Sequence, residues 1–242
     1  MAKKSQAAEI HEHLLEVFKY LTRSKPIGSY AKRLSTSCGI ALAQLGTARP
    51  DSWDLVMQPC VLDIRGGTTR GQQDCIEIVI GAEAKAAGGR LTYQSVPLNI
   101  ILGPRCFSHD PPWCAHPAAT VSAVASRRVH FDYDVAVTKR PKHHLQIGGN
   151  AAELHQAGSY HYAVAEDPSE PRIPAPSLDF VLVLDLVMRE FHTRLDLPQD
   201  PAWRKLVLRS QEIFLKPYFE DAHNHLQRKG TDLPPLIEHL SR

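Results

Sequence analysis

Regularly spaced turns between residues 53 and 147 constrain the fold of this chain more than any other feature. Short apolar segments run up to the glycine pairs at 66–67 and 88–89, and no helical periodicity lies between them. Antiparallel strands can be joined by such short turns, whereas parallel strands need long crossover connections. The pattern therefore predicts an antiparallel meander. Its strands are expected at about 55–64, 75–80, 91–102, 120–137 and 144–147.

Two helices are predicted before the strands. Residues 5–23 carry apolar side chains three or four positions apart, which is typical of an amphipathic helix, and Ser5 can cap its first turn. Residues 30–45 have weaker helical character and stop at Gly46, which suits a helix C-terminus.

The helical pattern returns after the strands. Residues 151–176 contain four prolines, which lack the N–H that a helix needs, so a connector is expected there. Two further helices are predicted, from Ser177 or Asp179 to about residue 195 and from Asp200 to about residue 229 with a bend at Pro217. Helices, a meander and further helices define a single α+β domain. It is divided into a helical part at 1–50, a sheet at 51–150, the connector at 151–176 and a helical part at 177–242.

The composition limits the classes of function. With 28 Lys and Arg against 26 Asp and Glu the net charge is +2, so any contact with nucleic acid must come from a local basic patch. No apolar run approaches the roughly 20 residues that cross a bilayer, which predicts no membrane-spanning segment. Five cysteines without a C-x-x-C pair, and a basic N-terminus without a signal-peptide core, predict a cytoplasmic protein. Neither a glycine-rich phosphate loop nor a G-x-S-x-G motif is present.

One predicted strand carries a row of polar side chains. Alternate strand residues share a face, so the odd-numbered residues of segment 127–137 are expected to pack on the core. The even-numbered face carries Arg128, His130, Asp132 and Asp134. Two carboxylates at this spacing could bind a divalent cation or orient a water molecule, and the guanidinium could hold a phosphate. The alternative is a solvated face whose opposite charges screen one another.

A histidine follows where a hairpin would bring the chain back beside these acids. In such a hairpin His144 and Gln146 share a face and lie opposite the carboxylates. An acid pair facing a histidine is a common arrangement for general acid–base catalysis or metal binding. The predicted catalytic residues are therefore Asp132, Asp134 and His144. Substrate contacts are expected from Arg128, His130, Gln146 and Arg172.

The hairpin also contains a basic run. Lys139, Arg140 and Lys142 form a modest phosphate-attracting patch on an otherwise balanced chain. Contact with nucleic acid is one interpretation of this run, and a solvated hairpin tip is the other.

Two thiols and two imidazoles within eleven residues form a candidate zinc site. The spacing C-x2-H-x4-C-x-H could close a tetrahedral structural site that staples a proline-rich loop. Its ligands would be Cys106, His109, Cys114 and His116. Alternatively, both cysteines are small apolar packing residues. Of the chain's 13 histidines, the nine outside these groups are expected to be solvent, helix-end or loop residues.

Three short motifs resemble an uncharacterised family of prokaryotic proteins. The segments 130–134 and 141–145, with Pro171 to Pro174 before a helix, are similar to that family's Arg-Phe-Asp-Tyr-Asp, His-Pro-Lys-x-His-Leu and Arg-Ile-Pro segments. The resemblance covers residues 127–195 and implies site positions at Asp132, Asp134, His144 and Arg172. His130 replaces the family's arginine, for which Arg128 could substitute. The family implies a bacterial setting, in a mobile element or phage defence, and no particular reaction.

The order of elements also resembles that of ubiquitin-conjugating enzymes and their inactive relatives. The catalytic enzymes need a cysteine shortly after the His-containing segment, and no cysteine follows Cys114 here. The resemblance therefore implies only a non-catalytic binding module.

These features lead to three hypotheses. The first is a component of a bacterial phage-defence or toxin-like system, a hydrolase or nuclease that acts on nucleic acid or another phosphate-bearing ligand. The second is a non-catalytic adaptor that binds a partner protein through its helices. The third is a structural domain with a zinc-stapled loop.

Overall fold

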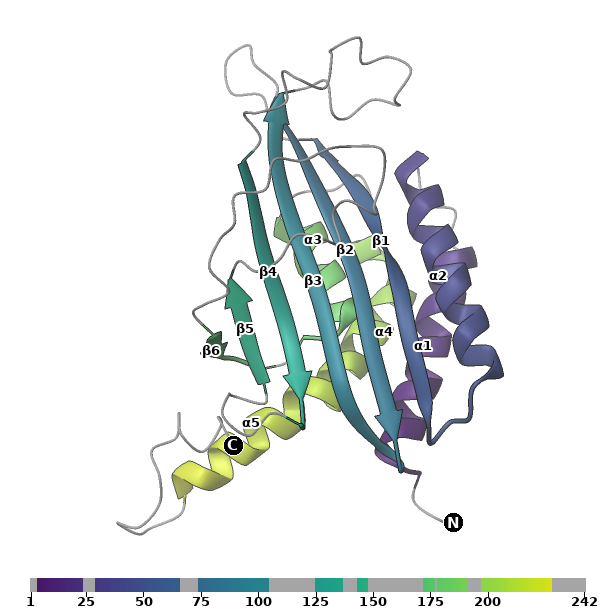
Figure 1. The fold of residues 1–242 in the computed structure, drawn as a ribbon, viewed down its shortest axis with the longest axis vertical. Helices are drawn as coiled ribbons and strands as arrows, with labels where there is room; N and C mark the ends of the chain where they lie inside the picture. The colour runs from purple at the N-terminus through teal and green to yellow at the C-terminus, as the bar shows by residue number, and fades with distance from the viewer. Residues whose placement is uncertain are drawn as a thin grey trace.

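The computed structural model describes residues 4–23, 29–65, 74–104, 125–136, 143–147, 172–176, 178–190 and 197–227. Within these ranges six strands form one antiparallel sheet in the order β1-β2-β3-β4-β5-β6, with the helices on one of its faces (Figure 1). The prediction of an α+β protein with N-terminal helices, a central meander and C-terminal helices is confirmed.

Most boundaries agree with the sequence pattern, but β2 extends seven residues beyond its predicted end at residue 80. The strands are β1 (Trp53–Arg65), β2 (Asp74–Ala87), β3 (Arg90–Pro104), β4 (Ala125–Asp134), β5 (His143–Ile147) and β6 (Arg172–Pro174). The helices are α1 (Gln6–Arg23), α2 (Ser29–Thr47), α3 (Phe180–Glu190), α4 (Pro201–Ser210) and α5 (Lys216–Gln227). Short helical turns occupy Leu197–Gln199 and Gln211–Leu215.

Three helices begin at the predicted caps. The backbone N–H of Ala8 donates to Ser5 Oγ at 3.2 Å, and that of Leu182 donates to Asp179 Oδ1 at 3.0 Å. Asp200 accepts from the N–H of Ala202 at 2.7 Å, with a proline in the first turn of α4. Each side-chain oxygen satisfies an N–H that the first turn of a helix leaves without an internal partner.

Two features of the C-terminal half were not predicted. The predicted connector contains strand β6, which pairs with β5. A three-residue edge strand can contain proline because one of its sides has no ladder to maintain. A π-helical turn occupies Gln211–Leu215, just before Pro217, the residue at which a bend was predicted. Proline cannot donate to the preceding turn and crowds it, so the helix widens there. Residues 191–196 and 228–242 lie outside the described part.

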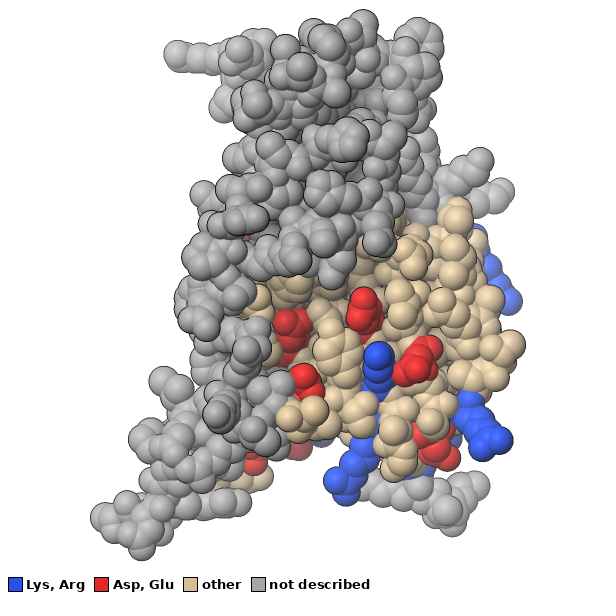
Figure 2. Space-filling view, viewed as in Figure 1, with Lys and Arg blue, Asp and Glu red and all other residues tan. Residues whose placement is uncertain are grey.

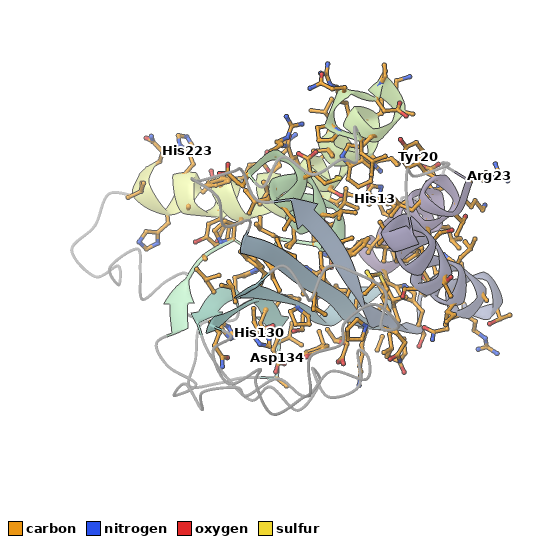
Figure 3. All side chains as sticks on the ribbon, turned by 90° about the horizontal axis from the view of Figure 1, so that it is seen from above. His13, Tyr20, Arg23, His130, Asp134 and His223 are labelled. Atoms are coloured by element: carbon orange, nitrogen blue, oxygen red, sulfur yellow. The ribbon has the colours of Figure 1, made fainter. Side chains whose placement is uncertain are left out.

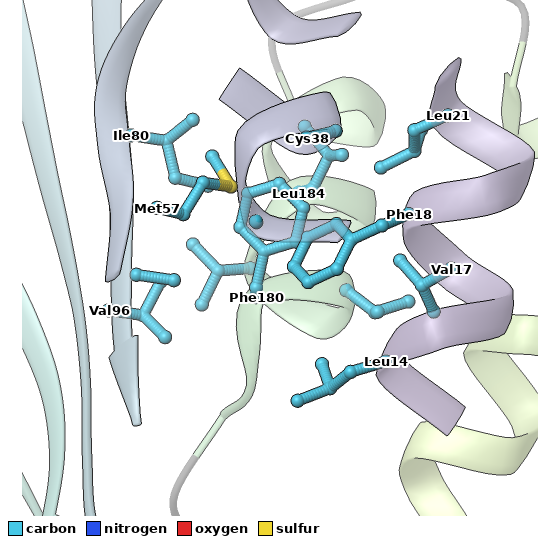
Figure 4. Close-up of a cluster of buried hydrophobic side chains, with 14 of the residues drawn as sticks. Leu14, Val17, Phe18, Leu21, Cys38, Met57, Ile80, Val96, Phe180 and Leu184 are labelled. Carbon is cyan, nitrogen blue, oxygen red and sulfur yellow. The ribbon is translucent and has the colours of Figure 1, made fainter. Parts of the chain in front are cut away.

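The hydrophobic core lies between the sheet and the helices. Side chains from α1, α2, α3 and the sheet meet there, and the rings of Phe18 and Phe180 lie 6.0 Å apart (Figure 4). Phe131 and Tyr133 of β4 pack against this core, as the alternation predicts. The described helices contain none that is long and apolar enough to cross a membrane.

The β2–β3 turn fastens the sheet to the start of α1. Gly88 and Gly89 have φ values of 58° and 78°, which glycine adopts without a steric penalty. The N–H of Ala7 donates to the Gly89 carbonyl at 3.0 Å, and a Cβ added at Gly89 would lie 3.1 Å from the Cβ of Ser5. The turn therefore needs glycine for its backbone and for its close approach to α1.

Gly89→Ala is expected to lower the free energy of unfolding by about 1–2 kcal/mol, because alanine is strained at positive φ and meets Ser5. Gly46→Ala is the matched control. It lies in α2 with open space around its Cβ position and should raise stability by about 0.5–1 kcal/mol. Urea unfolding followed by circular dichroism measures both, and a stabilising Gly89→Ala would contradict the packing of the turn on α1.

Candidate acid–base site on the open face of the sheet

The even-numbered residues of β4 lie on the face of the sheet that the described helices leave uncovered. His130 and Asp134 point to the side opposite His13 and Tyr20, which belong to the helical layer (Figure 3). We call this side the open face because no described helix packs on it, although Ser95, His144 and Gln146 on this side are at most 9% exposed. The same alternation of core-facing and outward-facing residues continues in β2. Its alanines at 82, 84 and 86 are buried in the core, whereas Glu83 and Lys85 face the open side.

Strand register brings the predicted site residues into two neighbouring rows. In the first row Ser95 of β3 pairs with Asp132 of β4, which pairs with His144 of β5. In the second row His130 pairs with Gln146, and Gln146 pairs with Arg172 of β6. Residues paired across adjacent strands lie on one face. The register thus gathers residues from four strands, β3 to β6, of which the hairpin pattern of the sequence links only β4 and β5.

The first row contains the closest contact between predicted catalytic residues. Ser95 Oγ donates to Asp132 Oδ1 at 2.6 Å, and His144 Nε2 lies 3.5 Å from Asp132 Oδ2. The Asp132 side chain is 16% exposed and that of His144 6% exposed. A carboxylate beside an imidazole can hold that ring in one orientation and stabilise its protonated form, which is what proton transfer requires.

The second row lies beside this pair. His130 is half-buried and Gln146 is buried, so both contribute polar groups within the sheet layer. Arg172 occupies the register position opposite Gln146, and Arg128 the position opposite Asn99. Both arginines therefore lie on strands next to the pair, and their side chains are outside the described part.

Asp134 has a different environment from Asp132. Its Oδ1 accepts the backbone N–H of Ala136 at 2.9 Å, which closes the turn at the end of β4. The structure thus brings Asp132 and His144 together. Asp134 lies two residues further along β4, where it pairs with Tyr93 of β3. The Asp134 carboxylate accepts the N–H of Ala136, whereas the Asp132 carboxylate contacts Ser95 and His144.

The metal predictions fall on different parts of the chain. The zinc candidates Cys106, His109, Cys114 and His116 lie outside the described residues, as does the basic run 139–142. Among the residues that the structure describes, no three His, Cys, Asp or Glu side chains are grouped so as to hold a metal ion.

Charges of both signs share the described part of the open face (Figure 2). Exposed Asp54 and Lys85 and half-buried Glu83 accompany Asp132 and Asp134 there, by their register on β1, β2 and β4. Acidic and basic groups this close reduce the net potential of the surface. Attraction of phosphate would therefore depend on individual cations rather than on a continuous basic surface in the described region.

Aromatic rings support the site from the core side. His143 precedes His144 in β5 and so faces the opposite side of the sheet. Its ring lies between those of Tyr133 and Tyr218, with centroid distances of 4.6 Å and 5.7 Å. Burial raises the pKa of both tyrosines. The stack joins β4, β5 and α5.

His225 lies in the last turn of α5, as the sequence predicts, but it is buried rather than exposed to solvent. It is only 6% exposed. It lies seven positions after Tyr218, which is about two helical turns, so both occupy the same side of α5. That side is directed inward, because Tyr218 contacts His143 of the sheet.

A second polar cluster, absent from the sequence predictions, lies buried between three helices. His13 Nε2 lies 2.7 Å from Ser210 Oγ, which donates to Asp179 Oδ2 at 2.9 Å. All three residues are at most 2% exposed. We call them the buried network. Burial lowers the pKa of His13 to about 4 and raises that of Asp179 to about 6.

The buried network has structural rather than catalytic geometry. In a nucleophilic triad the histidine lies between the acid and the serine, whereas here Ser210 lies between Asp179 and His13. No solvent reaches Ser210, which is 0% exposed. The network therefore ties α1, α4 and the N-terminus of α3 together. Its members lie up to 197 residues apart, so no sequence signal identifies it.

Comparisons with protein-family models, curated proteins and solved structures find no match to this chain.

Proposed function

We propose that the protein is a hydrolase that acts on nucleic acid or another phosphate-bearing ligand at the Asp132–His144 pair. The observation that carries the proposal is the 3.5 Å approach of His144 Nε2 to Asp132 Oδ2 on the open face. Catalytic contacts of this kind are often long without substrate and shorten when it binds. Arg128 and Arg172, on strands beside the pair, are the proposed phosphate contacts.

In the proposed reaction a water molecule attacks the phosphorus atom of a phosphodiester. His144 takes the proton from the water as the new P–O bond forms, and Asp132 stabilises the resulting imidazolium. The ester P–O bond breaks, and the leaving oxygen takes a proton from solvent. Arg128 and Arg172 would stabilise the charge that builds on the phosphoryl oxygens.

Asp132→Asn and His144→Gln are expected to reduce hydrolysis of single-stranded DNA or RNA by at least about 100-fold, because each removes one half of the acid–base pair. Asp54→Asn is the control. It removes an exposed carboxylate of the same face from the distant strand β1 and should retain wild-type activity. Product formation on labelled oligonucleotides is the measurement. Wild-type rates in both site variants would refute catalysis at this pair.

We further propose that the reaction takes place in the bacterial cytoplasm, in defence against phage. The support is the resemblance of short motifs within residues 127–195 to an uncharacterised prokaryotic family, which implies a setting in a mobile element or in phage defence. Expressed in a phage-challenged host, the wild type should reduce plaque formation and His144→Gln should not.

Exposed apolar side chains on α5 support a second candidate, a non-catalytic adaptor. Phe219 and Leu226 are 57% and 66% exposed and lie two helical turns apart, on one side of the helix. An adaptor would keep its protective effect in His144→Gln and lose it when both residues are replaced by serine. Under the hydrolase hypothesis, protection is lost in His144→Gln and kept when Phe219 and Leu226 are replaced by serine.

A further inference from the structure

We infer that Ser95 is a positioning residue of the Asp132–His144 pair, and that it determines which nitrogen of His144 carries the proton. The inference rests on the proposed acid–base function of the pair. Ser95 pairs with Asp132 in the sheet register and donates from Oγ to Oδ1 at 2.6 Å. It lies 37 residues before the acid, on a strand that the sequence motifs do not connect with the site.

The two oxygens of Asp132 have different contacts. Oδ1 accepts the Ser95 hydroxyl, so Oδ2 is the oxygen that faces His144 Nε2. A carboxylate on its own rotates over a broad range of its last torsion. Ser95 is 7% exposed and lies on β3, a strand held on both sides by β2 and β4. Its hydroxyl is therefore a fixed point that limits this rotation.

A fixed Oδ2 also selects the tautomer of the neutral imidazole. A negative oxygen near Nε2 attracts a proton to that nitrogen and repels a lone pair there. Neutral His144 is then protonated at Nε2 and basic at Nδ1, so Nδ1 takes the proton of the attacking water. Within the described strands, the other charged or titratable residues around the pair by register are Glu83, Tyr93, His130, Asp134 and Arg172.

Nitrogen-15 NMR on the labelled full chain tests this assignment. His144→Gln identifies the His144 signals by their loss. In the wild type the Nε2–H tautomer of neutral His144 should dominate. Ser95→Ala should lower its share, whereas Ser95→Thr, which keeps a hydroxyl, should retain it. In hydrolysis assays Ser95→Ala should reduce kcat about tenfold with KM unchanged, and Ser95→Thr should restore it.

A tautomer ratio that Ser95→Ala leaves unchanged overturns the inference, whatever the activity. A shifted ratio in a protein without hydrolytic activity upholds the role of Ser95 and refutes the proposed function instead. If Ser95→Ala does not fold, the tautomer ratio of His144 is measured in Asp132→Asn instead. This substitution replaces the charge that attracts the proton, so it should shift the ratio in the same direction as Ser95→Ala.

Discussion

Asp179→Asn is expected to make the protein gain stability as the pH rises from about 4 to 6.5, and His13→Gln is expected to make it lose stability over nearly the same range. Over this range the free energy of unfolding changes by about 3 kcal/mol in each variant, because each pH unit between the folded and unfolded pKa values contributes about 1.36 kcal/mol. In the wild type the two effects oppose each other and largely cancel.

The His13 effect follows from a lowered pKa. Burial is the main cause, the positive charge of Arg209 adds to it, and together they bring the pKa from 6.5 to about 4. Between these values the unfolded chain binds a proton at His13 and the folded protein does not. Acidification therefore favours unfolding, and the stability present above pH 6.5 is lost as the pH falls through 4. Asp179→Asn leaves this effect unopposed.

The Asp179 effect has the opposite sign. Burial raises its pKa from 3.8 to about 6, although the N–H of Leu182 and the hydroxyl of Ser210 pull it down. Between these values the folded protein binds the extra proton. The stability that protonation gives is complete below pH 3.8 and is lost as the pH rises through 6. His13→Gln leaves this loss uncompensated.

The free energy of unfolding is measured with urea at half-unit pH steps for each variant and for the wild type. The difference between the two curves removes the contribution of the other carboxylates, which both proteins share. Asparagine retains the capping ability of Asp179, so the start of α3 should be preserved. The variant with both replacements is the control and should follow the wild-type curve. Slopes of the same sign in the two single variants would show that the buried network does not hold these protonation states.

The sequence was informative where structure depends on neighbours along the chain. The caps at Ser5, Asp179 and Asp200 depend on an N–H two or three residues away, and the β2–β3 turn depends on its own two glycines. The meander follows because each strand pairs with the next. These interactions are local, so composition and spacing suffice to predict them.

The candidate site was predictable only in part for the same reason. Asp132 and His144 are 12 positions apart across one hairpin, and alternation places both on one face. Ser95 joins them through the β3–β4 register, which no local pattern determines. Ser210 lies still further from its partner His13, and only the packing of α4 on α1 brings them together. Short β6 was missed because Pro174 within it and the prolines around it are typical of a connector.

Trp203→Ala is expected to lower the free energy of unfolding by about 3–5 kcal/mol, more than Gly89→Ala. Trp203 is 0% exposed and lies in α4 with its ring 5.9 Å from that of Tyr20. Its Nε1 donates to Asp185 Oδ1 at 2.8 Å. Alanine leaves a large cavity and removes a donor from a buried carboxylate, which then depends more heavily on Arg189. Against a total of about 5–15 kcal/mol, this loss would leave a marginally folded protein.

Trp203→Phe separates the two contributions, because phenylalanine fills most of the space and cannot donate a hydrogen bond. It should cost about 1–3 kcal/mol, the penalty for a buried acceptor that loses a donor. Leu208→Ala, on the same helix but 58% exposed, should change stability by less than about 0.5 kcal/mol. Circular dichroism is the suitable measurement, because tryptophan fluorescence changes with the substitution itself. If Trp203→Ala lowered the free energy of unfolding no more than Leu208→Ala does, the Trp203 ring would not be what packs α4 against the core.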